Sequence, residues 1–261
     1  MILAAHLDDQ LQLVNAEELP SLDVRFTGAD VASYAATLRE FAEVTKLDEF
    51  LASQQPYVAT VEATVRTLLA DAKAVPWFDG LFGVQPRTRY VVVPGLLTGT
   101  RNFAARATLA DGTHELYQVL GIHAADGLPS TDAQSVALLV HEMAHSYVNP
   151  VTAAHRAALE PGGAALFAGV ADLMKPQAYD RWSIFVDESI VRAVVVRFVT
   201  ERAGEAAGQA EIATQERLGF RWTRPLVEQL ARYQRERATY PDLAAFMPEI
   251  AKALAALAAQ P

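Results

Sequence analysis

The chain has 261 residues, of which 51% are hydrophobic, and this length is enough to bury one large core. Its formal net charge of −9 at pH 7 argues against nucleic acid as a partner, because basic surfaces bind the phosphate backbone. Cysteine is absent, which excludes disulfides, thiolate metal sites and cysteine nucleophiles.

The sequence predicts a soluble protein without a membrane span. No stretch approaches the roughly 18 consecutive apolar residues that predict a membrane span. The first residues, MILAAHLDDQLQL, lack a basic stretch ahead of an apolar run, so no complete signal peptide is expected. The compartment is left open, since a trimmed N-terminus would also fit a secreted or periplasmic protein.

Helical spacing of apolar residues predicts an N-terminal helical layer over residues 1–88. Residues 28–30 (Gly-Ala-Asp) are typical of a helix start. The apolar residues of this first helix are Val31, Tyr34, Leu38, Phe41 and Val44. A second helix is predicted after Pro56, and the breaker-rich residues 77–83 predict a turn.

A small antiparallel sheet is predicted next. Residues 90–93 form a short β-branched run that Pro94 and Gly95 end. Residues 102–110 and 113–120 then flank an Asp-Gly pair, which predicts a hairpin with a type I′ turn.

The rest of the chain is predicted to be helical, with helices at about 183–201, 222–236 and 243–259. The expected fold is therefore a mostly helical α+β fold in one domain, residues 1–261. Its sections are the helical layer 1–88, the sheet and following helix 89–148, and a helical subdomain 149–261.

Residues 131–150 read TDAQSVALLVHEMAHSYVNP and predict one capped helix. Thr131 and Gln134 match the capping box, and Asn149-Pro150 is expected to end the helix. The helix carries no Asp, Glu, Lys or Arg from 135 to 140 or from 143 to 149, so it is expected to be buried. Buried polar side chains need partners, and a metal ion would supply one.

His141 and His145 stand one helical turn apart, so both imidazoles lie on one face, where two nitrogens can bind one zinc ion. Glu142 follows the first histidine. It is placed to take a proton from a zinc-bound water, as the general base of a hydrolase does. The predicted cofactor is Zn²⁺.

A catalytic zinc needs a third protein ligand, and Glu188 is the best candidate. Ile184, Glu188 and Val191 share one face of the helix predicted at 183–201, so Glu188 is an acid within an apolar stripe. Such a carboxylate needs a cation beside it, which zinc would provide. The alternative partner is Arg192, four residues later on the same helix.

The other candidates for the third ligand are Asp187, His155 and Glu160. Asp187 lies about 100° off the apolar stripe and is expected to be solvated. His155 lies in a charged segment after Pro150 and is expected at the surface.

The His-Glu-x-x-His string with a later helix-borne glutamate resembles the gluzincin branch of zinc metallopeptidases. The chain also resembles a bacterial zincin-like family catalogued as domain of unknown function 4932. As in that family, HEMAHSYVNP stands at 141–150 and ESIVRA at 188–193. The resemblance implies a substrate-binding edge strand, an active-site helix and a helix that donates the third ligand. In this reading His141, His145 and Glu188 are ligands and Glu142 is the base.

One position departs from the gluzincin pattern. Gluzincins often carry an acid one turn after the ligand glutamate, where it orients a zinc histidine, but here that position is Arg192. The group that orients His141 or His145 is therefore left open.

The expected activity is zinc-dependent hydrolysis of a peptide or protein substrate that lies along an edge strand from residues 89–110. Candidates for the oxyanion donor are Tyr147, Tyr179 and Arg192. Two alternatives stay open: a non-catalytic zincin-like protein with a structural or vestigial zinc site, and a helical binding module without metal.

Overall fold

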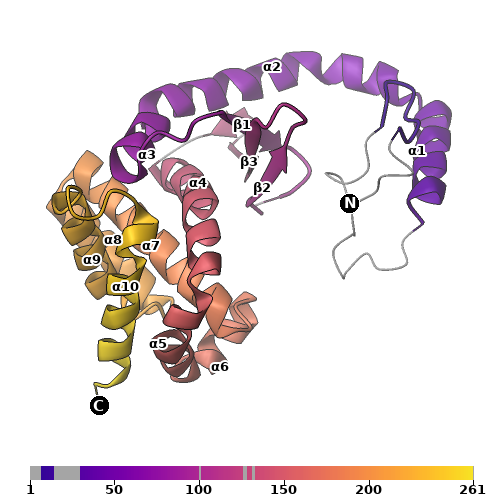
Figure 1. Cartoon of the computed structure of the whole chain (residues 1–261). Coiled ribbons are helices and arrows are strands. Elements are labelled where there is room, and N and C mark those ends of the chain that lie inside the picture. Colours follow the sequence, from indigo (N-terminus) through magenta and orange to yellow (C-terminus); the bar gives the residue numbers. More distant parts are fainter. Residues whose placement is uncertain (1–6, 15–29, 100, 126–127, 131–132, 261) are drawn as a thin grey trace. The chain divides into compact units, whose positions relative to one another are not determined.

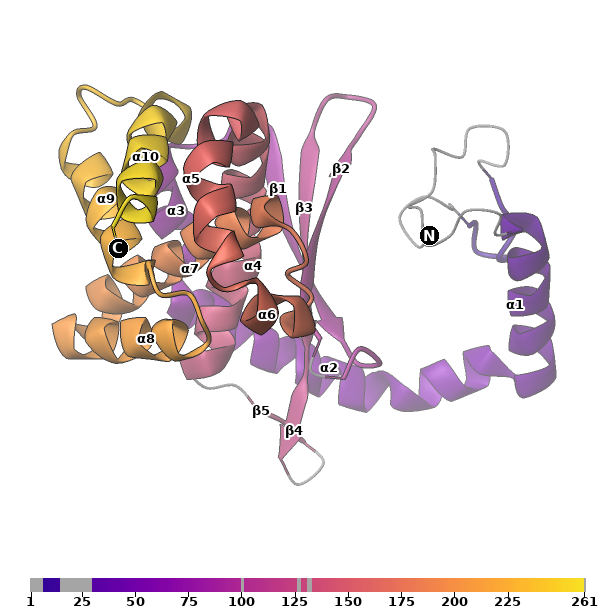
Figure 2. The same ribbon diagram turned by 90° about the horizontal axis from the view of Figure 1, so that it is seen from below.

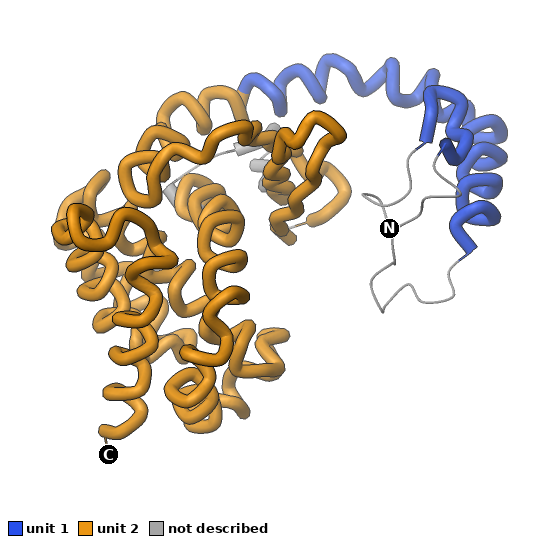
Figure 3. The backbone as a smooth tube through the Cα atoms, viewed as in Figure 1, with its two compact units in different colours: residues 1–63 blue, residues 64–261 orange. Residues whose placement is uncertain are grey.

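The computed structural model describes residues 7–14, 30–99, 101–125, 128–130 and 133–260 (Figure 1). It confirms the α+β class, because helices dominate and a small sheet lies between them in the sequence. The chain divides into two compact units, residues 1–63 and 64–261 (Figure 3). The organisation as a single domain stays a prediction. Within the described residues, no helix combines the length and hydrophobicity needed to cross a membrane.

Helix α1 (Val31–Thr45) begins where the sequence predicts, because the Asp30 carboxylate accepts a hydrogen bond from the Ser33 amide at 2.9 Å. Residues 28 and 29 lie outside the described residues. Helix α2 (Leu47–Ala72) begins nine residues before Pro56, so its predicted start was wrong. Acidic residues in its first turn favour the earlier start, and Pro56 lies inside the helix without ending it.

Helix α3 (Ala74–Phe82) occupies the segment that was predicted to be a turn. Pro76 lies in its first turn, where a missing amide hydrogen costs little. Phe78 and Leu81 are almost fully buried, and Gly83, with φ of 91°, ends the helix. Burial of this apolar face outweighs the breaker residues.

The sheet is mixed, which corrects the antiparallel prediction. Its order is β1 (Thr88–Gly95), β3 (His114–Gly121), β2 (Phe103–Thr108). Strand β2 pairs antiparallel with β3, whereas β1 pairs parallel with β3. Strands β1 and β2 follow each other in the sequence but are not neighbours in the sheet, because β3 lies between them. Strand β2 is thus left as an edge of the described sheet.

The hairpin between β2 and β3 is confirmed, but its turn is not type I′. Only Gly112 has a positive φ, 80°, while Asp111 does not. The loop is longer: the Leu109 amide donates to the Thr113 carbonyl at 2.8 Å, and the Thr113 amide donates to the Asp111 carboxylate at 2.8 Å. A second short hairpin, β4 (His123–Ala125) with β5 (Leu128–Ser130), precedes the next helix.

Helix α4 (Ala133–Ala154) runs through Pro150, so the predicted helix end was wrong. Proline removes one helical hydrogen bond, but Val148 and Thr152 on either side of it are fully buried, and this packing keeps the segment helical. The helix lies against the sheet, close to β2 and β3 (Figure 2). Thr131 of the predicted capping box lies outside the described residues.

Helix α7 (Trp182–Ala203) crosses α4 and is surrounded by other helices of the second unit. Nearly every residue from Phe185 to Val196 is buried. The predicted helices at 183–201, 222–236 and 243–259 are confirmed as α7, α9 (Thr223–Arg235) and α10 (Leu243–Ala258). The second unit also contains helices that the sequence pattern did not single out: α5 (Arg156–Ala168), α6 (Ala171–Met174), the 3₁₀ turn Lys175–Gln177 and α8 (Glu205–Arg217).

Candidate metal centre

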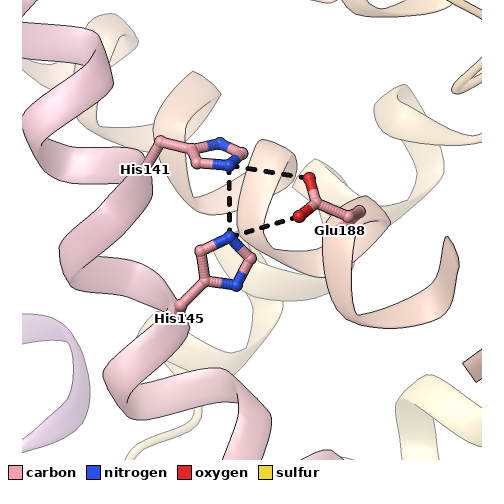
Figure 4. A group of neighbouring side chains, drawn as sticks. All are labelled: His141, His145 and Glu188. Atoms are coloured by element: carbon pink, nitrogen blue, oxygen red, sulfur yellow. Dashed lines mark hydrogen bonds and ion pairs between the residues drawn. The ribbon is translucent and has the colours of Figure 1, made fainter. Parts of the chain in front are cut away.

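Three side chains from α4 and α7 converge at one point (Figure 4). The Nε2 atoms of His141 and His145 are 3.2 Å apart. The carboxylate of Glu188 lies 3.5 Å from the first of these nitrogens and 3.2 Å from the second. The two histidines come from successive turns of α4, and the glutamate comes from the helix packed across it. The three residues predicted as ligands are therefore brought together.

The spacing of the three donors fits a zinc ion. Two ligand atoms about 2.0–2.1 Å from a tetrahedral zinc lie roughly 3.3 Å from each other. The three separations in this cluster are close to that value. Two imidazoles and one carboxylate are also a donor set that zinc takes in catalytic sites, with one position left open.

The Glu188 carboxylate lacks a hydrogen bond that its burial requires. Its side chain is 10% exposed, and Oε2 is a buried atom without a hydrogen-bond partner. Such an atom is costly unless a further group satisfies it. A cation held between the three side chains would do so.

Arg192 forms an ion pair with this carboxylate but no hydrogen bond to it among the described residues. Its Nε lies 3.5 Å from Glu188 Oε2 and is itself a buried atom without a hydrogen bond. The other guanidinium nitrogens donate to Gln215 Oε1 at 2.5 Å and to the Tyr179 hydroxyl at 3.0 Å. The guanidinium also lies 4.2 Å from the centre of the Phe220 ring. Arg192 thus flanks the carboxylate while it is held by other residues.

The charges of the cluster suit a metal cation. Burial lowers the pKa of His141 to about 4, so this imidazole is neutral at neutral pH. Burial alone would raise the pKa of Glu188, but the hydrogen bond from His145 and the nearby histidines and Arg192 lower it to about 2. The site therefore presents a neutral imidazole and an ionised carboxylate, which are the forms that bind zinc.

Asn149 orients His145. Its side-chain oxygen lies 3.3 Å from Nδ1 of the imidazole, four residues earlier on α4. Burial works against protonation of His145, but its hydrogen bond to Glu188 and further contacts with Asn149 and Glu142 raise its pKa overall. If a metal replaces the proton that Nε2 shares with Glu188, a hydrogen kept on Nδ1 and donated to Asn149 leaves the Nε2 lone pair for the metal.

Glu142 is almost buried, with 6% of its surface exposed. Burial raises the pKa of its carboxyl to about 7, with a smaller opposing effect from His145. A group with a pKa near neutrality can both accept and return a proton at physiological pH. Glu142 thus has the acid–base property that a general base needs.

The metal cluster opens into a pocket of about 670 Å³. One wall is Asn102 with residues 103–106 of the edge strand β2, and the other is α4 between His141 and Pro150. Glu142, Tyr179 and Glu188 also line it. A second pocket of about 660 Å³, between α4, α7 and α8, borders His141, Glu142 and Tyr179 as well.

Comparison with known proteins identifies the family. The profile of the family described as "Domain of unknown function (DUF4932)" matches residues 4–253, almost the whole chain. The chain belongs to this family. No curated protein and no solved structure shows a significant match to the chain.

In this DUF4932 chain, the other three sequence candidates lie outside the cluster. Asp187 was expected to be solvated but is 8% exposed, and this correction follows from the burial of α7 on nearly all sides. Its two oxygens accept hydrogen bonds from Arg156 at 2.9 and 2.6 Å. His155 is half-buried, with Nδ1 2.8 Å from the Val151 carbonyl, and Glu160 is exposed.

The three candidates for an oxyanion donor differ in position. The Tyr147 ring stacks on Phe78 at 4.8 Å, and its hydroxyl bonds the Tyr90 hydroxyl, so it belongs to the core between α4 and the sheet. Arg192 lines the second of these two pockets and not the first. Tyr179 lines both pockets, and its hydroxyl accepts a hydrogen bond from Arg192 and lies within hydrogen-bonding reach of Glu188.

Proposed function

We propose that the protein is a zinc-dependent peptide-bond hydrolase of the gluzincin type. The observation that carries this proposal is the triangle of His141, His145 and Glu188 beside Glu142, in a pocket bounded by an edge strand. The order of strand hairpin, histidine helix and glutamate helix supports a zincin-like arrangement. Zinc in such a site, when bound, acts as a Lewis acid and lowers the pKa of water to near neutrality.

Glu142 performs the proton transfers in this proposal. Its carboxylate accepts a proton from the attacking water as the oxygen bonds to the scissile carbonyl carbon. The same carboxyl then donates that proton to the leaving amine as the carbon–nitrogen bond breaks. The pKa of about 7 that burial gives Glu142 suits both steps.

Tyr179 and β2 provide the remaining functions. The Tyr179 hydroxyl donates a hydrogen bond to the oxyanion of the tetrahedral intermediate. The neighbouring Arg192 guanidinium, 3.0 Å away, fixes the hydroxyl and strengthens it as a donor. Among the strands that the structure describes, none pairs with the outer edge of β2 beside the pocket, so an extended peptide can add there as a further strand.

The alternative is a zincin-like protein whose zinc is structural or vestigial. Two observations favour catalysis over it. The cluster opens to a large pocket, whereas structural zinc sites are closed by a fourth protein ligand. Glu142 is a buried carboxyl within that pocket, and a structural site gains nothing from it.

Digestion of a broad peptide library tests the proposed function. Zinc-loaded protein should cleave peptides at internal bonds, and a chelator should stop the cleavage until zinc is restored. Mass spectrometry of the products checks this. A library left intact by protein that carries its full zinc would favour the structural alternative.

Asn149→Ala should weaken zinc binding by about 10–100-fold, because the imidazole of His145 loses the partner that fixes its orientation. Competition with a chromogenic chelator measures the affinity. Asn149→Asp should restore it, since a carboxylate oxygen also accepts the Nδ1 hydrogen.

Ser146→Ala is the matched control, on the same helix and lining the same pocket. It should bind zinc like the wild type. Wild-type affinity in Asn149→Ala would show that Asn149 does not position the ligand.

A further inference from the structure

Arg106 lies on the edge strand that borders the metal cluster. It is the cross-strand partner of Leu116, which is 1% exposed. Gln118, two residues further along β3, contacts Ser146 of α4. Side chains two apart on a strand share a face, so Leu116 and Arg106 face α4. The Arg106 side chain therefore leaves the sheet on the side of the pocket that it lines.

The guanidinium of Arg106 has no partner among the described residues. The side chain is exposed and makes no ion pair and no hydrogen bond with any of them. Arg89 on β1 differs, because it pairs with Glu115 across the strands. A free guanidinium is a fork of donors that fits a carboxylate.

The charged side chains of the pocket are separated by sign, with carboxylates at the cluster and Arg106 on the β2 wall. The acids that line the pocket are Glu142 and Glu188, both buried at the cluster, and Arg106 is the one arginine or lysine among the described lining residues. An extended peptide that adds to β2 would place its residues beside this guanidinium, because the strand itself supplies it. In a chain of net charge −9, a lone cation here favours an anionic group at this wall.

We propose that Arg106 selects peptides that carry a carboxylate next to the residues held at the metal cluster. This inference rests on the proposed function and names its substrate class. The carboxylate is either an aspartate or glutamate side chain or the C-terminus of the peptide, and both present the same two oxygens to the guanidinium. An arginine that only keeps the sheet edge from pairing with other chains would show no such selection.

Binding of labelled peptides to zinc-loaded Glu142→Gln protein tests this inference without requiring cleavage. Fluorescence anisotropy would compare four versions of one alanine-based peptide: a neutral amide, an amide with one glutamate, the same amide with lysine in its place, and a neutral peptide with a free C-terminus. Moving the glutamate along the peptide locates the preferred position.

We expect a peptide with a carboxylate to bind about 10-fold more tightly than the neutral amide. In the Glu142→Gln background, Arg106→Ala should remove that difference and Arg106→Glu should reverse it in favour of the lysine peptide. Arg235→Ala, at an exposed arginine on α9 away from the pocket, should keep it. Preference for the glutamate amides identifies a side chain, and preference for the free acid identifies a C-terminus.

Equal affinities of all four peptides, or a preference that survives Arg106→Ala, would overturn the inference. Absence of measurable peptide binding would overturn it too. Wild-type protein that binds the carboxylate peptides through Arg106 but cleaves none of them would contradict the proposed hydrolysis and leave the selection by Arg106 standing. The two failures are therefore distinguishable.

Discussion

Glu142→Gln should lower peptide turnover by roughly 10²–10⁴-fold and leave zinc bound. The amide has the same shape as the carboxyl but cannot accept the proton of the attacking water. Zinc should stay bound because Glu142 is not a ligand in the proposed site, where His141, His145 and Glu188 are the three donors. Turnover measured at full zinc occupancy, with zinc content determined in the same sample, checks both parts.

Two results would contradict this role of Glu142. Loss of zinc in the glutamine variant would mean that the side chain holds the metal or the local structure. Turnover close to that of the wild type would mean that another group takes the proton. Glu142→Asp should show turnover between that of the wild type and that of Glu142→Gln, because it retains a carboxylate but withdraws it by one methylene group.

Glu188→Ala should lower zinc affinity by about two orders of magnitude or more. Zinc sites with four ligands have apparent binding free energies of about 10–16 kcal/mol, so one ligand accounts for roughly 3 kcal/mol. Glu188→Asp should lower zinc affinity almost as much, because the carboxylate retracts from the two histidines. Competition against a chelator of known affinity measures both variants.

Asp187→Ala is the matched control for Glu188→Ala. Both acids lie on α7 and are 8% exposed, but Asp187 pairs with Arg156 rather than with the histidines. Its loss should destabilise the fold by about 1–3 kcal/mol, because Arg156 is left without its partner, and zinc affinity should stay near that of the wild type. Arg192→Ala should likewise keep the metal and at most weaken it. Equal zinc content in Glu188→Ala and the wild type would remove the glutamate from the site.

The cluster of His141, His145 and Glu188 was predictable because its geometry is largely local. His141 and His145 are placed by the period of one helix, and Glu188 stood out as an acid on an apolar stripe. The same reasoning failed for Asp187, because it assumed that α7 has a solvated side. Helices α4, α5, α8 and α9 all pack against α7, so its sequence alone does not indicate which of its acids is buried. The pairing of Asp187 with Arg156 depends on α5, which the sequence pattern did not reveal.

Asn149 shows how a helix-end signal can hide a residue that contacts the candidate metal ligands. It stands four residues after His145, the spacing at which two helical side chains meet. Because Pro150 follows it, the pair was interpreted as the end of the helix. The buried packing of α4 beyond Pro150 keeps Asn149 helical and within reach of the imidazole.

The sheet illustrates the limit of strand patterns. The two strand-like runs and the Asp-Gly pair between them predicted the hairpin. They carry no information on how a third strand pairs with it. The parallel pairing of β1 with β3 is fixed by the path of the connection across the sheet, which is a tertiary property. The proposed function depends on this arrangement, because among the described strands it leaves β2, and with it Arg106, at the edge beside the pocket.

Zinc stoichiometry tests the central claim most directly. The protein would be incubated with zinc, dialysed against a mild chelator and analysed for metal and protein content. The donor triangle predicts about one zinc per chain in the wild type and far less in His145→Ala, which lacks one of three ligands. Wild-type protein that is folded and retains no zinc after this treatment would contradict the metal centre and the hydrolase built on it.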